Sequence, residues 1–262
     1  MLRAFYSSAT GMRAQELLID NTANNIANVN TNGFKRSQLD FADLIYATSK
    51  PPGANAGGAQ IAPTGIQIGS GVRPVGTTKI FSNGVIQTTE NSTDIAIEGS
   101  GFFKVILPNN AEKFTRDGSF RVGPNGDLVN GDGFLLAPGI QIPTDIPLSQ
   151  ISISEFGDVT ANVGASTLPL GQIQLYQFQN PAGLSSEGSN LYAITPASGP
   201  AIEGPPGTNG AGYLRSGFLE KSNVEVVHEL VSLITAQRAY EFNSRAIRAG
   251  DEMLSTTSQI IR

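Results

Sequence analysis

Residues 222–262 read SNVEVVHELVSLITAQRAYEFNSRAIRAGDEMLSTTSQIIR. Apolar side chains recur in this stretch at every seventh position, which is typical of one face of a long α-helix: Val226, Leu233, Tyr240, Ile247, Leu254 and Ile261. Ser222 and Glu225 have the spacing of a capping box, which predicts that the helix begins there. The neighbouring line, which starts at Leu230, continues with polar residues. A helix with one narrow apolar line does not bury itself, so it needs a partner.

The N-terminal segment has the same spacing. Residues 2–27 carry an apolar line on the predicted helix face, formed by Phe5, Met12, Ile19 and Ile26. An asparagine-rich run follows and ends at Gly33, which is typical of a helix end. We therefore expect the two terminal helices to pair with each other as a coiled coil.

Between the helices the pattern is that of β-strands. From Gly65 to about Gly217, short alternating segments are separated by Gly, Asn and Asp turns, and no helical pattern interrupts them. Residues 114–122 (FTRDGSFRV) predict a hairpin with Asp117 and Gly118 as its turn, and Asn125-Gly126 and Asp132-Gly133 predict further turns. The expected fold class is mixed α and β, with terminal heptad helices around an antiparallel β-rich middle domain.

The breaker-rich segment 49–58 contains two prolines and several glycines. It has two interpretations: a flexible surface loop, or a segment that becomes ordered only in an assembly. The heptad lines also have two interpretations. They pack within a folded monomer, or they form the seam of an assembly, in which alanines beside the line (Ala236, Ala239, Ala246, Ala249) let further copies approach. A repeated contact that does not close would produce a helical filament.

Composition argues against most chemistry. The chain has 17 basic and 22 acidic residues, a net charge of −5, which does not favour nucleic acid as a partner. It has no cysteine, and His228 is its one histidine, so we expect no zinc site, no other metal, no cofactor and no catalytic residues. We also expect no membrane insertion and no cleaved secretory signal, because charged residues interrupt the apolar ones of the first twenty residues.

Three motifs, in order, resemble those of the bacterial flagellar rod and hook proteins: ANNIANVNTNGFKR at 23–36, TENSTDIAIEGSGFFKV at 89–105 with FTRDGSF at 114–120, and AQRAYEFNSRAIRAGDEML at 236–254. The chain length and PTGIQIGSGVRPV at 63–75 resemble most the members that form the distal rod. The residues that carry the resemblance are Asn25, Ile26, Ala27, Asn28, Thr31, Gly33, Phe34, Gly99, Gly101, Phe102, Phe103, Gln237, Arg238, Ala239 and Tyr240.

The resemblance implies a subunit that stacks helically into a rigid, hollow drive shaft across the periplasm, transmits torque to the hook and forms part of the export channel. The implied division is an N-terminal inner-tube helix (1–30), an extended linker (31–70) with a rod-type segment (46–65), a β-rich outer domain (71–221) and a C-terminal inner-tube helix (222–262). The implied partners are other copies of the chain, hook protein above, proximal rod proteins below, the outer ring (bushing) proteins and the flagellar type III export apparatus.

Two alternatives remain open at this stage. Within the same family, the chain would be a proximal rod or hook-type subunit. In a different class, it would be a cell-wall-active enzyme or a carbohydrate-binding β module, although no acid/base pair stands in a recognisable motif.

Overall fold

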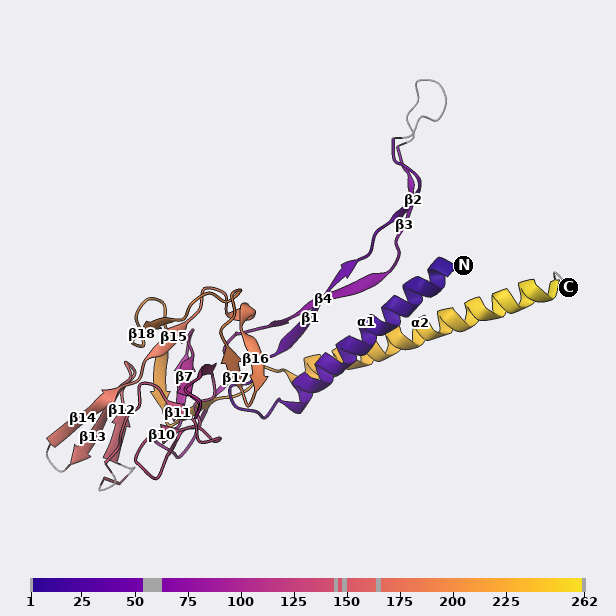
Figure 1. Cartoon of the computed structure of the whole chain (residues 1–262). Helices are drawn as coiled ribbons and strands as arrows, with labels where there is room; N and C mark the ends of the chain where they lie inside the picture. Colours follow the sequence, from indigo (N-terminus) through magenta and orange to yellow (C-terminus); the bar gives the residue numbers. More distant parts are fainter. Residues whose placement is uncertain (1, 54–62, 144–145, 148–149, 164–165, 261–262) are drawn as a thin grey trace. The chain divides into compact units, whose positions relative to one another are not determined.

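In the computed structural model one long helix precedes and one follows a β-rich middle along the chain, as the sequence pattern predicts (Figure 1). The structure describes all residues except 1, 54–62, 144–145, 148–149, 164–165 and 261–262. The chain divides into two compact units, each built from separate pieces of sequence. Unit 1 comprises Met1–Ile26, Ser37–Thr78 and Val226–Arg262, and unit 2 comprises Ala27–Arg36 and Lys79–Glu225.

Unit 1 contains both helices. Helix α1 spans Leu2–Ala27, which confirms the helix predicted for residues 2–27. Helix α2 spans Val226–Ile260. It therefore begins four residues after the predicted cap at Ser222. The reason is that residues 222–225 belong to unit 2, where the Asn223 side chain accepts a hydrogen bond from the Arg36 amide at 2.7 Å and donates one to the Ile80 carbonyl at 2.8 Å.

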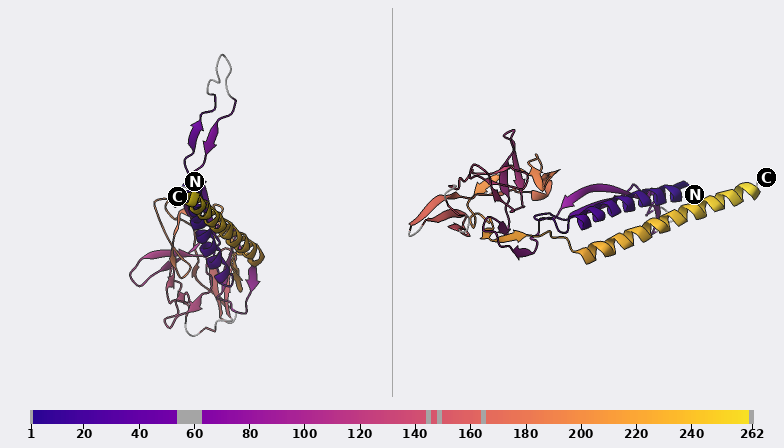
Figure 2. Two further views of the ribbon diagram at one scale, coloured as in Figure 1. Left: turned by 90° about the vertical axis from the view of Figure 1, so that its right-hand side faces the viewer. Right: turned by 90° about the horizontal axis from the view of Figure 1, so that it is seen from below.

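The two helices lie side by side and run in opposite directions in both perpendicular views (Figure 2). The end of α1 nearest the N-terminus therefore lies along the later part of α2. The first turn of α2 lies beside the last turn of α1, where Asn25 and Glu229 are hydrogen-bonded.

The rest of unit 1 is β-structure. Its strands form two two-stranded sheets, β1 with β4 and β2 with β3; their bounds are β1 Ser37–Asp43, β2 Ala47–Lys50, β3 Ile66–Ile68 and β4 Val72–Lys79. Strands β2 and β3 are antiparallel, with Ala47 opposite Ile68. The Val72 amide donates to Thr10 Oγ1 of α1 at 3.4 Å, so the ribbon of β1 and β4 is attached to the helix.

Unit 2 holds the remaining strands. Their bounds are β5 Ile86–Thr88, β6 Ile95–Glu98, β7 Phe103–Ile106, β8 Glu112–Thr115, β9 Arg121–Val122, β10 Leu128–Val129, β11 Leu135–Leu136, β12 Ile151–Ile153, β13 Asp158–Val163, β14 Ser166–Gln172, β15 Leu175–Gln177, β16 Ser185–Gly188, β17 Leu191–Ala193, β18 Ile202–Gly204, β19 Tyr213–Ser216 and β20 Phe218–Glu220, with a short 3-10 helix η2 at Pro181–Gly183. The largest sheet has the order β16-β17-β8-β7-β11-β10-β9, and smaller sheets pair β12-β13-β14, β15-β18, β19-β6 and β20-β5.

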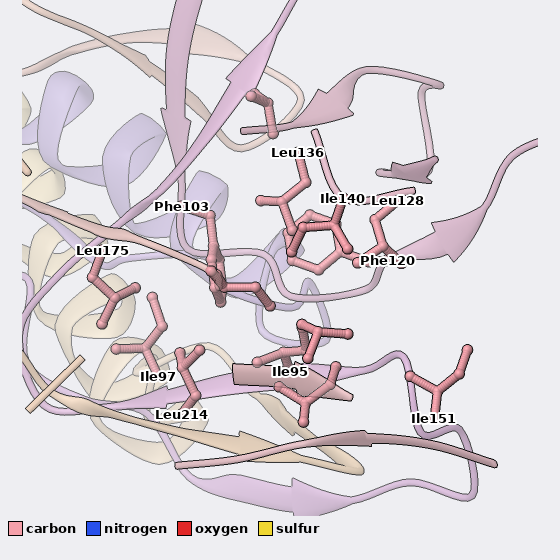
Figure 3. Packing of buried hydrophobic residues seen from close by; sticks show 14 of the residues in the cluster. Ile95, Ile97, Phe103, Phe120, Leu128, Leu136, Ile140, Ile151, Leu175 and Leu214 are labelled. Atoms are coloured by element: carbon pink, nitrogen blue, oxygen red, sulfur yellow. The ribbon is translucent and has the colours of Figure 1, made fainter. Parts of the chain in front are cut away.

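The core of unit 2 is formed by alternating strand residues. In β7, Phe103 and Val105 are buried whereas Lys104 and Ile106 are only partly so, as expected for a strand with one face inward. Phe103 and Val105 pack with Ile95 and Ile97 of β6 in one large apolar cluster (Figure 3). A second, aromatic cluster is formed by Phe102, Phe114, Tyr176, Phe178, Leu184 and Tyr192.

The hairpin predicted for residues 114–122 is wrong. Strand β8 pairs with β7 and β17, whereas β9 pairs with β10. The chain crosses between them because the Ile95 amide donates to the Gly118 carbonyl at 3.0 Å, and a Cβ at Gly118 would overlap the Ile95 carbonyl. The predicted turn at Asn125-Gly126 joins β9 to β10, and the one at Asp132-Gly133 joins β10 to β11, so both are confirmed.

Candidate functional sites: the helix seam and the buried charge cluster

The two helices of unit 1 meet along a line that we call the helix seam, where α1 and α2 contact each other at three levels. The Asn25 amide nitrogen lies 3.2 Å from Glu229 Oε2. A Cβ added at Gly11 would lie 2.9 Å from the amide nitrogen of Asn243, and one added at Gly250 would lie 2.7 Å from Cζ of Phe5. The residue numbers of the contacts therefore rise along α1, from Phe5 to Asn25, and fall by about the same amount along α2, from Gly250 to Glu229. These contacts define one antiparallel register.

The most buried line of α2 is made of small and polar residues. Glu229 and Ala236 are 1% and 2% exposed, Asn243 is partly buried and Gly250 is buried; the four are spaced by seven. On α1, Ala14, Thr22 and Asn25 are buried. At two levels a side chain of one helix approaches the backbone of the other at a glycine: Asn243 at Gly11 and Phe5 at Gly250.

The predicted apolar lines lie beside this buried line. Six of their members are partly buried: Phe5, Met12, Ile19, Ile26, Leu233 and Ile247. Val226, Tyr240 and Leu254 are exposed, and Ile261 lies outside the described residues. Their role in self-assembly stays a prediction. The apolar pattern does not indicate the line from Glu229 to Gly250; the signal for it is the recurrence of small residues, Ala236 and Gly250, at heptad spacing.

Asn25 joins three elements at the end of α1. Its side-chain oxygen accepts a hydrogen bond from the Ser37 amide at 3.0 Å, and its amide nitrogen donates to the Ser37 carbonyl at 2.9 Å as well as to Glu229. Asn21 donates to the same carbonyl at 2.8 Å. Asn25 and Glu229 are both 1% exposed, so this polar contact is withdrawn from solvent.

The second candidate site is a cluster of three buried charges in unit 2, which we call the charge cluster. Lys35 Nζ lies 2.6 Å from Glu220 Oε1, and Arg116 Nη1 lies 3.5 Å from Glu220 Oε2. Lys35 also donates to the Ser82 carbonyl at 2.8 Å, and Arg116 donates to the Gly99 carbonyl at 2.9 Å. The side chains of all three charged residues are at most 2% exposed.

Burial dominates the electrostatics of this cluster. Desolvation lowers the pKa of Lys35 below its ordinary value, and the Glu220 carboxylate opposes that shift. The pKa of Arg116 is lowered in the same way, again against the effect of Glu220. Glu220 is thus the one anion that compensates two buried cations in the cluster, and it also accepts a hydrogen bond from the Gly84 amide at 2.8 Å.

The charge cluster fastens the segment after α1 to the β-structure of unit 2. The Gly33 amide donates to the Glu220 carbonyl at 2.8 Å, and Gly33 has a φ of 68°, in the left-handed region. A Cβ there would lie 2.6 Å from the Arg116 carbonyl carbon, so only glycine fits. Phe34 is buried, and Lys79 Nζ lies 4.6 Å from the centre of its ring.

The remaining motif residues fall into different environments. Gly99 and Gly101 have φ values of 118° and 140°, and Phe102 and Phe103 after them are buried in the two apolar clusters. Thr31 donates to the Asn28 side chain at 3.1 Å, while Ala27 is exposed. On α2, Gln237 and Arg238 are exposed and Ala239 is partly buried.

Nothing in the part of the chain that the structure describes resembles a metal centre or a membrane span. No three His, Asp or Glu side chains gather there in a way that suits a metal ion. Neither helix, within its described residues, has an apolar run long enough to cross a bilayer. His228 lies exposed on α2.

Comparison with known proteins agrees with the motifs. Three family models match the chain: flagella basal body rod protein at residues 5–35, flagellar hook protein FlgE/F/G D1 domain at 96–161, and flagellar basal body rod FlgEFG protein C-terminal at 215–260. The chain belongs to this family of flagellar axial proteins.

Within the family, the chain is similar over its whole length to proteins named flagellar basal-body rod protein FlgG. It is 45% identical to that of Borreliella burgdorferi, with 100% of both chains covered. It is 46% identical to that of Buchnera aphidicola from Acyrthosiphon pisum, covering 99% of this chain and 100% of the relative. It is 39% identical to that of Bacillus subtilis, covering 97% of each.

Proposed function

We propose that the chain is a structural subunit of the flagellar distal rod, which polymerises helically into a rigid, hollow shaft that transmits torque to the hook and forms part of the export channel. Two kinds of support converge on this proposal. Relatives named FlgG match the chain from end to end. The helices also present apolar surface that their own seam does not cover.

That uncovered surface is the observation that carries the proposal. Among the described side chains of α2, nine large apolar ones are at least 39% exposed: Val226, Val227, Leu230, Val231, Ile234, Tyr240, Phe242, Met253 and Leu254. Burying one such side chain contributes about 1.5–3 kcal/mol, so a polymer that covers many of them gains substantial stability. Soluble monomers seldom leave this much apolar surface exposed. Other copies of the chain, placed by a repeated heterologous contact, would cover it.

Coiled-coil pairing of α1 and α2 is part of this proposal. The contacts at Phe5, Gly11 and Asn25 support it, together with the heptad spacing of the buried line in α2. In this view the seam holds the two helices together, and the predicted apolar lines and the outer side of α2 contact neighbouring subunits in the inner tube. The charge cluster holds the segment that follows α1 in the chain against the β-structure of unit 2, which would form the outer domain.

The ribbon of β2 and β3 supports a second assembly contact. Ile66 and Ile68 of β3, and Tyr46 just before β2, are at least 50% exposed, and a two-stranded sheet is marginally stable alone. We propose that segment 46–65 packs against a neighbouring subunit and stiffens the rod; residues 54–62 of this segment lie outside the described residues.

The proposed partners follow from the place of the distal rod. They are hook protein above, proximal rod proteins below, the outer ring proteins that act as a bushing, and the flagellar type III export apparatus, which would export the chain without a cleaved signal peptide. The proposed location is the part of the basal body that spans the periplasm.

The test is to locate the chain and to disrupt its outer α2 surface. Gold labelling of purified basal bodies should mark the rod segment next to the hook. Val231→Asp, at a side chain that is 57% exposed, should leave the isolated chain folded but yield basal bodies without a distal rod or hook. Ser255→Asp adds the same charge at an exposed polar position of α2 and should assemble. Label confined to the base of the rod would favour the proximal alternative, and normal rods with Val231→Asp would refute the proposed surface.

A further inference from the structure

The residues of the helix seam fit one another in size. In the register defined by its three contacts, large residues lie level with small ones: Phe5 meets Gly250, and Asn243 meets Gly11. The same register brings Leu18, which is partly buried, level with Ala236, which is 2% exposed. The buried polar pair of Asn25 and Glu229 lies at the other end of the seam.

We propose that the Asn25–Glu229 hydrogen bond, together with the close approaches at Gly11 and Gly250, determines the register of the antiparallel helix pair and excludes alignments slipped by one heptad. Asn25 acts as a positioning residue in this proposal. The inference deepens the proposed rod function, because subunits can stack regularly only if every copy presents the same helix surface.

A slip of seven residues in one direction removes the complementarity. Gly11 would then lie level with Gly250, where two residues without side chains leave a void, and Leu18 would lie level with Asn243. Asn25 would lie level with Ala236, which has no acceptor on its side chain. The void and the loss of the hydrogen bond between Asn25 and Glu229 both disfavour this alignment.

A slip in the other direction is disfavoured by charge. Glu229 would lie level with Leu18, so its carboxylate would lose the Asn25 donor while it stayed inside the seam. Losing a hydrogen bond to a buried carboxylate costs free energy, so this alignment is disfavoured as well. A single buried polar contact that specifies alignment is an established device in coiled coils.

The register matters for assembly because one heptad is about 10 Å along a helix. A slipped pair would displace the exposed apolar side chains of α2 by this distance relative to α1. A neighbouring copy that contacts both helices would no longer meet the same surface.

The chain contains no cysteine, so pairs of introduced cysteines report the register directly. Gly11→Cys with Asn243→Cys reports the native alignment. Gly11→Cys with Ala236→Cys, and Leu18→Cys with Asn243→Cys, report the two slipped alignments. Whole cells that express the tagged full-length chain are oxidised, and intrachain disulfides are read on a blot that includes assembled and unassembled copies.

In the otherwise native chain, the 11/243 pair should cross-link about tenfold more than either slipped pair, the ratio expected for one hydrogen bond to a charged group. Asn25→Leu should lower the 11/243 yield and raise at least one slipped yield to a comparable level. Asn25→Leu combined with Glu229→Leu should still pair the helices, with cross-links spread over several registers. Asp20→Leu, at an exposed position of α1, should leave the native preference unchanged.

The proposal would be overturned if, with Asn25 and Glu229 intact, the 11/243 pair cross-linked no more than the slipped pairs. An unchanged tenfold preference for 11/243 after Asn25→Leu would also overturn it. Absence of all three cross-links in the native chain would overturn it as well. The outcome is separable from the proposed function: a correct register in a chain that gold labelling places outside the rod would contradict the rod assignment alone.

Discussion

Lys35 Nζ lies 2.6 Å from Glu220 Oε1, although 185 residues separate the two in the sequence and both side chains are buried. Arg116 Nη1 lies 3.5 Å from Oε2, the other oxygen of the same carboxylate. This contact ties the segment after α1 to the last strand of unit 2.

Glu220→Gln should strongly destabilise unit 2, because it leaves Lys35 and Arg116 buried without their anion. The expected loss is about 3–5 kcal/mol in the free energy of unfolding, the usual result of breaking a buried ion pair from one side. Glu112→Gln is the control: Glu112 pairs with Lys104 at 3.1 Å but its side chain is 57% exposed, so the change should stay within about 1 kcal/mol. Urea unfolding of the purified chains measures both, and equal losses would contradict the role of the cluster.

Tyr192 should make unit 2 sensitive to alkaline pH. Burial among aromatic rings raises its pKa to about 12, with Arg116 lowering it and Glu220 raising it as smaller effects. Between pH 10 and 12 the unfolded chain loses this proton and the folded chain keeps it, so stability falls as pH rises, by up to about 3 kcal/mol.

Tyr192→Phe should remove this part of the loss of stability at alkaline pH. The lowered pKa of Lys35 acts with the opposite sign, adding stability as pH rises toward the ordinary lysine value, and it is common to both chains. The difference in urea midpoint between Tyr192→Phe and the native chain should therefore grow from pH 9 to pH 11.5. A constant difference over that range would show that Tyr192 is not the responsible group.

Gly33 and Gly133 form a matched pair for testing the junction after α1. Both have positive φ, 68° and 86°, but a Cβ at Gly33 meets the Arg116 backbone whereas one at Gly133 meets nothing within 4 Å. Gly133→Ala should cost about 1–2 kcal/mol from backbone strain alone. Gly33→Ala should cost clearly more, because backbone atoms have to move. Thermal unfolding of the two variants gives the comparison, and equal shifts in melting temperature would contradict the close contact.

Phe5 and Gly250 should behave as complementary shapes. Gly250→Leu places a large side chain where the Phe5 ring lies, so it should separate the helices at that level and reduce rod assembly. Adding Phe5→Ala makes room for the leucine and should restore part of the lost stability. We expect a coupling energy of about 1 kcal/mol or more in a double-mutant cycle. Urea unfolding followed by the helical circular dichroism signal reports the coupling. Additive losses would place the two residues out of contact.

Local pattern was sufficient for much of the fold. The bounds of α1 follow from an apolar line without proline and from the asparagine-rich run before Gly33, all of them properties of neighbouring residues. The β-rich middle and the turns at Asn125-Gly126 and Asp132-Gly133 follow from alternation and turn chemistry. The hairpin at residues 114–122 fails because Gly118 is held by Ile95 of another strand, a tertiary contact that overrides a good local turn signal.

The two candidate sites depend on contacts that no local pattern contains. Glu229, Asn243 and Gly250 are not apolar, so a search for hydrophobic periodicity passes over the line that the seam buries. Lys35 and Arg116 stand inside recognisable motifs, yet their shared partner Glu220 lies 185 and 104 residues away from them. Their partnership exists only once unit 2 has folded.

The central claim is that the chain forms the distal rod through the apolar side of α2 that the seam leaves uncovered. Electron cryomicroscopy of purified basal bodies tests this most directly, at a resolution that traces side chains. We expect to find the chain in the rod segment next to the hook, with the helix pair lining the inner tube and Val227, Val231 and Phe242 buried against neighbouring copies. A distal rod built from another chain, or one in which these three side chains face open solvent, would contradict it.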